Sequence, residues 1–173
     1  MKNLKFLISM ITVFAIALTF SACKGPSDTG ALPTEAESGG EISVSMSIEC
    51  FDILDNYSSL DEALQNEEYV PNNGIILSLD DVSIHDGDTV FDVLKKVTYE
   101  NDIQFEYEES LYGVYIKGLN YIYEDSCGTL GGWLYTVNGE EPQVGCDSFV
   151  LKDSDEVTWY YVCDFAAMYE DAS

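Results

Sequence analysis

The chain has 173 residues, and its 32 acidic residues outweigh seven lysines to give a formal charge of −25 at pH 7. This excess makes nucleic acid and anionic lipid headgroups poor partners, because both are bound through clustered cations. An acidic surface that keeps an exported domain soluble is the simplest explanation; the alternative is attraction of a cationic ligand or calcium. No segment matches a calcium-binding EF-hand loop, so no metal site is predicted.

Residues 1–22 have the pattern of a secretory signal, with a short basic start, an uncharged apolar run over residues 6–20 and two small residues. The run is shorter than the roughly 20 residues that a membrane-spanning helix needs. The stretch Phe20-Ser21-Ala22-Cys23 resembles a bacterial lipobox, with Phe20 where Leu is commoner. We therefore expect lipidation of Cys23 and an anchor at the membrane. Cleavage elsewhere, with Cys23 incidental, is the alternative.

The rest of the chain divides by composition. Residues 23–40 contain no aromatic residue and are rich in Gly, Pro, Ser, Thr and Glu, which is typical of a flexible tether. Residues 41–167 are long enough for one domain with its own core. Residues 168–173 form a short tail.

The two strongest strand patterns lie at the ends of this domain. Residues 41–50 alternate apolar and polar side chains, which predicts a half-buried strand. Residues 156–163 are apolar on both sides, as in a central strand. Each segment ends with a cysteine on its inward face, Cys50 and Cys163. If the two strands are parallel neighbours, these cysteines arrive at the same end and can form a disulfide.

Short strands dominate the segment between them, and this predicts an α+β fold. A helix begins after Thr89, which forms a predicted capping box with Asp92. Its apolar residues share one side, so it should pack on a sheet. The remaining expected elements are a weak helix over 58–66, a turn at 70–74, and strands over 75–78, 82–84, 103–107, 113–116 and 121–123.

Four cysteines remain once Cys23 is set aside: Cys50, Cys127, Cys146 and Cys163. In an exported domain an even number predicts two disulfides, with three connectivities to choose from. Zinc is a weak rival, since there is no C-x-x-C pair and His85 is the only histidine. His85 also has no serine or cysteine in evident reach for nucleophilic catalysis, so we predict that the chain is not an enzyme.

A recognisable order of residues begins at W-L-Y-T-V-N-G, residues 133–139. It continues with Pro142, Gly145-Cys146, Leu151-Lys152-Asp153, Asp155 and Trp159. With residues 88–94 and 116–119, the sequence resembles the transcobalamin-like C-terminal domain family over about 42–165. The resemblance implies a corrinoid ligand such as cobalamin. Ser154 departs from the family, which usually has glycine there; a positive φ at Ser154 would cost about 1 kcal/mol.

A second departure concerns the ligand. In the cobalamin carriers this domain closes over a ligand held by a helical barrel, and this sequence encodes no barrel. Because a well-held ligand loses roughly 70 to 90% of its surface to its pocket, one small domain would offer only half a site. The resemblance therefore implies a partner, either a helical-barrel protein or a vitamin transporter.

The residues before and within the predicted strand at 133–137 are the candidate ligand site. Gly131 and Gly132 would let a ligand approach the backbone, while Leu130 and Trp133 would supply an apolar surface, with Tyr135 on the same face as Trp133. The alternative is that this face belongs to the core.

These observations predict a small β-grasp-like mixed sheet with one main packed helix, stabilised by disulfides Cys50–Cys163 and Cys127–Cys146. The second pair would close a short loop around a hairpin whose turn is Asn138-Gly139, a type I′ signal. The predicted function is a surface-anchored lipoprotein that binds a corrinoid together with a partner. The alternative is a cell-surface module that binds a protein or a glycan.

Overall fold

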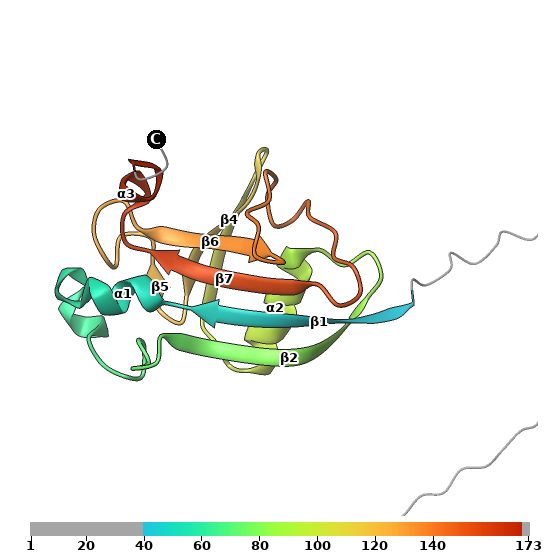
Figure 1. Ribbon diagram of the computed structural model, residues 1–173, viewed down its shortest axis with the longest axis horizontal. Coiled ribbons are helices and arrows are strands. Elements are labelled where there is room, and N and C mark those ends of the chain that lie inside the picture. Colours follow the sequence, from blue (N-terminus) through green and yellow to red (C-terminus); the bar gives the residue numbers. More distant parts are fainter. Residues whose placement is uncertain (1–39, 171–173) are drawn as a thin grey trace, which may run out of the picture. The chain divides into compact units, whose positions relative to one another are not determined.

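Two sheets and one main helix make up the fold in the computed structural model, which describes residues 40–170. The four-stranded sheet has the order β2-β1-β7-β6, and the three-stranded sheet has the order β3-β4-β5 (Figure 1). The elements are β1 (Glu41–Glu49), α1 (Phe51–Asp55), η1 (Tyr57–Ser59), η2 (Glu62–Leu64), β2 (Ile75–His85), α2 (Val90–Glu100), β3 (Phe105–Ser110), β4 (Gly113–Leu119), β5 (Ile122–Tyr123), β6 (Gly132–Val137), β7 (Glu156–Val162) and α3 (Phe165–Glu170).

The first and last strands lie side by side. β1 and β7 are parallel, with Ile48 opposite Trp159, whereas β2 and β6 pair antiparallel to them at the two edges. The sheet is therefore mixed, with the parallel pair β1 and β7 at its centre. The predicted α+β fold, with a mixed sheet and one main helix, is confirmed.

One face of this sheet forms the core. The alternate β1 residues Val44, Met46 and Ile48 are each at most 1% exposed. They belong to the same buried cluster as Leu94 and Val97 of α2, which lies behind the sheet in Figure 1. The opposite face carries the polar members of the alternation and is turned toward the viewer. Among the described residues, no helix crosses the strands on that side.

The start of α2 is fixed by the predicted capping box. The Asp92 amide donates to Thr89 Oγ1 at 3.2 Å, and the Thr89 amide donates back to Asp92 Oδ2 at 3.1 Å. Burial raises the pKa of Asp92, but the hydrogen bonds from Thr89 and the Lys95 ammonium outweigh it and lower that pKa below 3.8. The Asp92 carboxylate is therefore bound in its charged form.

Two details of the predicted secondary structure are wrong. The helix expected over 58–66 is replaced by two 3-10 turns, η1 and η2, because Leu60 between them is buried and pairs with Cys127 instead of following a helical period. The strands expected at 75–78 and 82–84 form one strand, β2. A bulge joins them, with Asp80 and Asp81 lying between the paired residues that flank Ser45.

Two turns adopt the backbone predicted for them. Asn138 and Gly139 both have positive φ, 55° and 78°, as a type I′ turn requires. This turn leads into a loop, residues 140–155, before β7 begins, so it does not join β6 to β7 directly. Ser154 has a φ of 68°, the strained value expected for a serine in a glycine position.

Candidate binding groove

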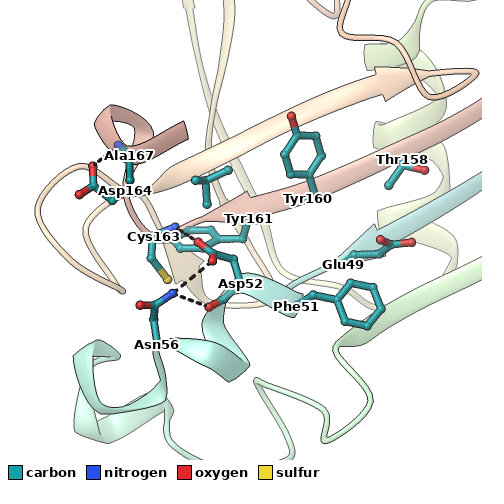
Figure 2. Close-up of a pocket in the computed structure, with 11 residues that line it drawn as sticks. Glu49, Phe51, Asp52, Asn56, Thr158, Tyr160, Tyr161, Cys163, Asp164 and Ala167 are labelled. Atoms are coloured by element: carbon teal, nitrogen blue, oxygen red, sulfur yellow. Dashed lines mark hydrogen bonds between the residues drawn. The ribbon is translucent and has the colours of Figure 1, made fainter. Parts of the chain in front are cut away.

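A groove of about 660 Å³ lies on the outward face of the four-stranded sheet, where β1 and β7 end. The two strands are parallel, so their carboxyl ends reach the same edge. There β1 leads into α1 and β7 leads into α3, and these short helices extend the walls of the groove (Figure 2). The groove is lined by Glu49, Phe51, Asp52, Asn56, Thr158, Tyr160, Tyr161, Val162, Cys163, Asp164 and Ala167.

Asp52 connects the two walls of the groove through hydrogen bonds. Its Oδ2 accepts a hydrogen bond from the Cys163 amide at 2.7 Å, and its Oδ1 accepts one from Asn56 Nδ2 at 3.1 Å. Asn56 Nδ2 also donates to the Asp52 carbonyl at 2.9 Å, which holds α1 in a single turn. Figure 2 shows the bond from Cys163, directly after β7, to Asp52, and the two bonds from Asn56 to Asp52 within the turn of α1. The groove is therefore built around a fixed carboxylate.

Phe51 and Tyr160 supply the aromatic surface. Phe51 remains 48% exposed, although it directly follows the buried Cys50. Its ring lies against Gly74, where any side chain would overlap it and where φ is +68°. The Tyr160 hydroxyl donates to Glu141, so the loop after β6 is attached to this face. Aromatic side chains therefore form part of the groove lining next to the Asp52 carboxylate.

The charge of the groove is entirely negative. Glu49, Asp52 and Asp164 all line it, and no lysine does. The ion pairs found among residues 40–170 lie elsewhere and use lysines of α2 and β4. Without a cation nearby, these carboxylates create an uncompensated negative potential at the end of the sheet.

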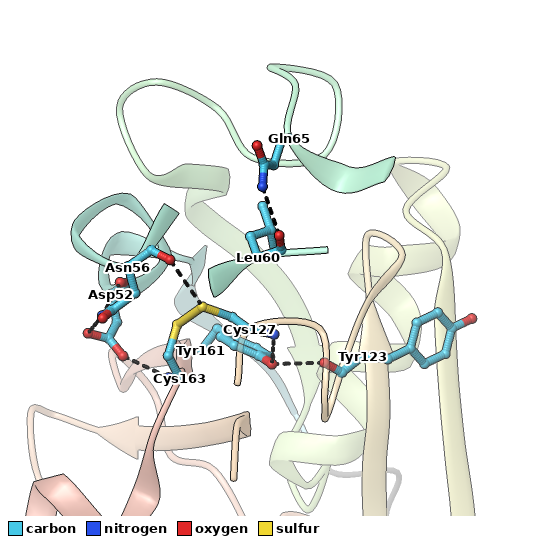
Figure 3. The surroundings of a disulfide bond; sticks show 8 residues. All are labelled: Asp52, Asn56, Leu60, Gln65, Tyr123, Cys127, Tyr161 and Cys163. Atoms are coloured by element: carbon cyan, nitrogen blue, oxygen red, sulfur yellow. Dashed lines mark hydrogen bonds between the residues drawn. A yellow bond between two sulfur atoms is a disulfide. The ribbon is translucent and has the colours of Figure 1, made fainter. Parts of the chain in front are cut away.

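The disulfide lies at the end of the groove and differs from the predicted pairing. Cys127 bonds to Cys163 with a Cα–Cα distance of 5.0 Å, so the predicted Cys50–Cys163 and Cys127–Cys146 pairs are both wrong (Figure 3). The strands are parallel neighbours as expected, but Ile48 is opposite Trp159. That register brings Cys50 level with Tyr161, two residues before Cys163.

Cys50 and Cys146 are buried free thiols. The Cys146 carbonyl accepts a hydrogen bond from the Phe91 amide in the first turn of α2, which keeps this residue in the core. Burial is the main cause that raises the pKa of each thiol to about 12, with a nearby carboxylate adding to it. At neutral pH both thiols are protonated and unreactive.

Tyr161 joins the groove to the core. Its hydroxyl accepts from the Cys127 amide at 3.2 Å and donates to the Tyr123 carbonyl at 2.9 Å (Figure 3). Burial raises its pKa to about 12. Its ring packs edge-on against Trp133, with the ring centroids 5.3 Å apart. The disulfide and Tyr161 together make this end of the groove rigid.

The predicted ligand residues at 130–135 lie close to the groove, but most of them are buried or half-buried in the protein. Trp133 is 5% exposed and its Nε1 donates to the Ile122 carbonyl at 2.8 Å, so its side chain belongs to the core, as the alternative had it. Tyr135 is half-buried against Trp159, and its hydroxyl donates to the Val144 carbonyl at 2.7 Å.

The two glycines accommodate the protein's own side chains. A Cβ at Gly131 would lie 2.5 Å from the Tyr161 hydroxyl, and one at Gly132 would lie 3.0 Å from Phe165. Leu130 is 52% exposed and lines a smaller recess beside the groove that shares Asn56, Cys163 and Asp164 with it. The ligand-binding role of Leu130, Gly131, Gly132, Trp133 and Tyr135 stays a prediction.

Other features bear on chemistry. His85 is exposed at the end of β2, and its amide donates to Asp88 Oδ2 at 2.9 Å. Within residues 40–170, no three His, Cys, Asp or Glu side chains are grouped so that they could hold a metal ion. In the same part of the chain no helix is long and apolar enough to cross a membrane. The predicted lipidation at Cys23 and the tether lie outside the described residues.

Comparisons with known proteins found one family model and several solved structures that are similar to this chain. A family described as a domain of unknown function (DUF4430) matches residues 87–162, from α2 to β7. One similar solved structure is the crystal structure of haptocorrin in complex with Cbi, with 20% identity and a TM-score of 0.47 over 74% of this chain and 27% of the haptocorrin chain. This chain thus spans about a quarter of haptocorrin.

A second similar structure is described as a "putative metal binding protein" from Ruminococcus gnavus ATCC 29149. It is 14% identical, with a TM-score of 0.44, over 69% of this chain and 95% of that chain. No curated protein matches the sequence.

Proposed function

We propose that this protein is a non-catalytic binding protein, held outside the cytoplasm by a lipid on Cys23, and that its ligand occupies the groove at the end of β1 and β7. The observation that carries the proposal is the groove itself. Its volume of about 660 Å³ falls within the roughly 300–1,000 Å³ of small-molecule sites. Its lining combines the exposed ring of Phe51 with a few fixed polar groups, as such sites do.

The proposed ligand is a corrinoid such as cobalamin, bound together with a partner chain. The sequence resemblance at residues 88–94, 116–119 and 133–159 supports this ligand class. The groove is open along the sheet face and covers only one side of a large planar ligand. A helical-barrel protein or a vitamin transporter would supply the second wall, and transfer of cargo would follow from separation of the two.

A titration tests this proposal. The processed chain, residues 23–173 in detergent, is titrated with cobalamin and followed by calorimetry, with and without a helical-barrel partner. We expect micromolar binding and about a tenfold loss of affinity in Phe51→Ala, because the ring is an exposed contact. Tyr99→Ala removes an 86% exposed ring on α2 and serves as the matched control, with unchanged affinity. Absence of binding at high micromolar corrinoid, alone and with the partner, would contradict the proposal.

The anchor has its own test. Cys23→Ala should abolish lipidation and release the protein from the membrane fraction into the soluble exported fraction. The wild-type chain should stay with the membrane after a high-salt wash, because acyl chains, unlike surface charges, resist screening. Equal release of both chains would count against a lipid on Cys23.

The alternative, a module for protein or glycan binding, has support at a different place. The tip of the β3–β4 hairpin carries Leu111 and Tyr112, which are 102% and 100% exposed. Two adjacent apolar side chains held in water are typical of an interaction site. If the hairpin is the functional surface, Leu111→Ser/Tyr112→Ser will abolish attachment of the purified protein to isolated cell walls, while Phe51→Ala will not.

A further inference from the structure

We infer that the groove selects ligands that carry a positive charge beside an apolar body. Among corrinoids this is the aqua form, a cation with water on cobalt, over the neutral cyano form. The corrinoid part of this inference rests on the function proposed above. The charge preference rests on the carboxylates of the groove.

Three carboxylates reach the groove from three different segments. Glu49 comes from the end of β1, Asp52 from α1, and Asp164 from the residue that precedes α3. Their convergence follows from the parallel pairing of β1 and β7, which brings both chain exits to one edge. A cation in the groove would therefore be approached from more than one side.

Two of these carboxylates have spare acceptor capacity. Glu49 Oε1 accepts from Ser47 Oγ at 2.8 Å, and Asp164 Oδ1 accepts from the Ala166 amide at 2.8 Å. Within residues 40–170, Glu49 Oε2 and Asp164 Oδ2 receive no hydrogen bond, and neither residue is in an ion pair. By contrast, both oxygens of Asp52 are used in holding the groove together. Glu49 and Asp164 are thus the residues available to a ligand.

The apolar part of the groove lies next to these charges. Phe51 presents its ring at 48% exposure, and Val162 and Ala167 contribute aliphatic surface. An aromatic face beside carboxylates attracts cations by two means, direct charge attraction and the cation–π interaction. A neutral ligand of the same shape gains only the apolar contact.

The expected size of the preference follows from the exposure of the site. An exposed ion pair contributes a factor of about two to five in affinity, and salt screens it. Two carboxylates together should favour the cationic form by about tenfold at low salt. High salt should remove most of this preference and leave the affinity for the neutral form unchanged.

The test compares two ligands that share the corrin ring. The processed chain in detergent is titrated by calorimetry with aquacobalamin and with cyanocobalamin, at low and high salt, in mildly acidic buffer that keeps the cobalt-bound water protonated. Glu49→Gln/Asp164→Asn should abolish the preference, since each change removes charge and keeps shape. Glu109→Gln/Glu140→Gln makes the same change in total charge at exposed sites outside the groove and should leave the preference intact.

A second pair of probes separates this inference from the proposed function. The peptide Trp-Lys-Lys-Trp and its lysine-acetylated form differ in charge but not in aromatic content. If corrinoids fail to bind but the unmodified peptide binds more tightly, with dependence on Glu49 and Asp164, the corrinoid function is overturned and the charge preference is supported. Equal affinity for both cobalamins, independent of salt, overturns the charge preference and leaves corrinoid binding in place.

A spectral measurement distinguishes charge attraction from direct coordination of cobalt by a protein side chain. The visible spectrum of bound aquacobalamin should remain that of the water-ligated form. A spectrum that reports replacement of the water by a protein side chain would overturn the inference, because the preference would then arise from a metal–ligand bond.

Discussion

The two faces of the four-stranded sheet consist of alternate residues of the same strands, and they differ in role: one packs in the core and the other carries the groove. In β1, Ile48 is 0% exposed and packs in the core, whereas its neighbours Ser47 and Glu49 point to the open face and are half-buried. In β7, Trp159 is buried in the core while Thr158 and Tyr160 line the groove. Stability and binding should therefore be separable along a single strand, residue by residue.

The sharpest test of this separation uses adjacent residues of β1. Ile48→Ala should lower the free energy of unfolding by about 2–5 kcal/mol, because it removes buried methyl groups and leaves a cavity. Ser47→Ala should cost about 1 kcal/mol or less, since it loses two side-chain hydrogen bonds on a half-exposed face. Urea unfolding measures both. Equal losses would show that the open face is covered in the native protein.

The disulfide should contribute to both faces. Replacing Cys127 and Cys163 with Ala removes a link that spans a sequence separation of 36, and should lower the free energy of unfolding by about 2–4 kcal/mol. It should also weaken corrinoid binding, because Cys163 lines the groove. Peptide mapping without reduction should recover Cys127 joined to Cys163, with Cys50 and Cys146 free. A Cys50 link to either partner would contradict the structure.

The helix cap should affect only the covered face. Thr89→Ala should cost about 1 kcal/mol, the usual value for an N-cap, and leave ligand affinity unchanged. The folded-state pKa of Asp92 lies below its ordinary 3.8, so its stabilisation is present above that pH and is lost as the pH falls through the folded value. Thr89→Ala should therefore flatten the loss of stability on acidification. An unchanged acid profile would show that the Thr89 bonds do not set the pKa of Asp92.

The smallest effect is expected at the turn that precedes β7. Ser154 holds a φ of 68°, so Ser154→Gly should stabilise the domain by up to about 1 kcal/mol and leave binding unchanged. Thermal unfolding monitored by circular dichroism would detect this as a small rise in midpoint. A fall in the midpoint would mean that the serine side chain makes a contact worth more than the backbone strain.

Local patterns in the sequence predicted the two central strands, the helix cap and the type I′ turn. The alternation of residues 41–50 identified β1, Thr89 and Asp92 identified the start of α2, and Asn138-Gly139 identified a type I′ turn. Each depends on neighbours in the chain, which a sequence displays directly. The α+β class followed from the number of strands.

Features that depend on distant contacts could not be predicted in the same way. The cysteine pairing required the register of β1 against β7, and a shift of two residues gives Cys163 to Cys127 instead of Cys50. For Trp133 the sequence left both ligand binding and the core open, and only the contacts with Ile122 and Tyr161 place its side chain in the core. Phe51 and Asp52 had no local signal, because the groove arises only where two strands far apart in sequence end together.

Chemical-shift mapping of the bound state would test the central claim most directly. The ¹⁵N-labelled processed chain in detergent would be titrated with aquacobalamin, and amide shifts would be assigned along the sequence. The groove account predicts that the largest changes fall in residues 49–56 and 158–164, the segments that line it. Changes concentrated at the hairpin tip, residues 110–113, or around the predicted residues 130–135, would contradict it.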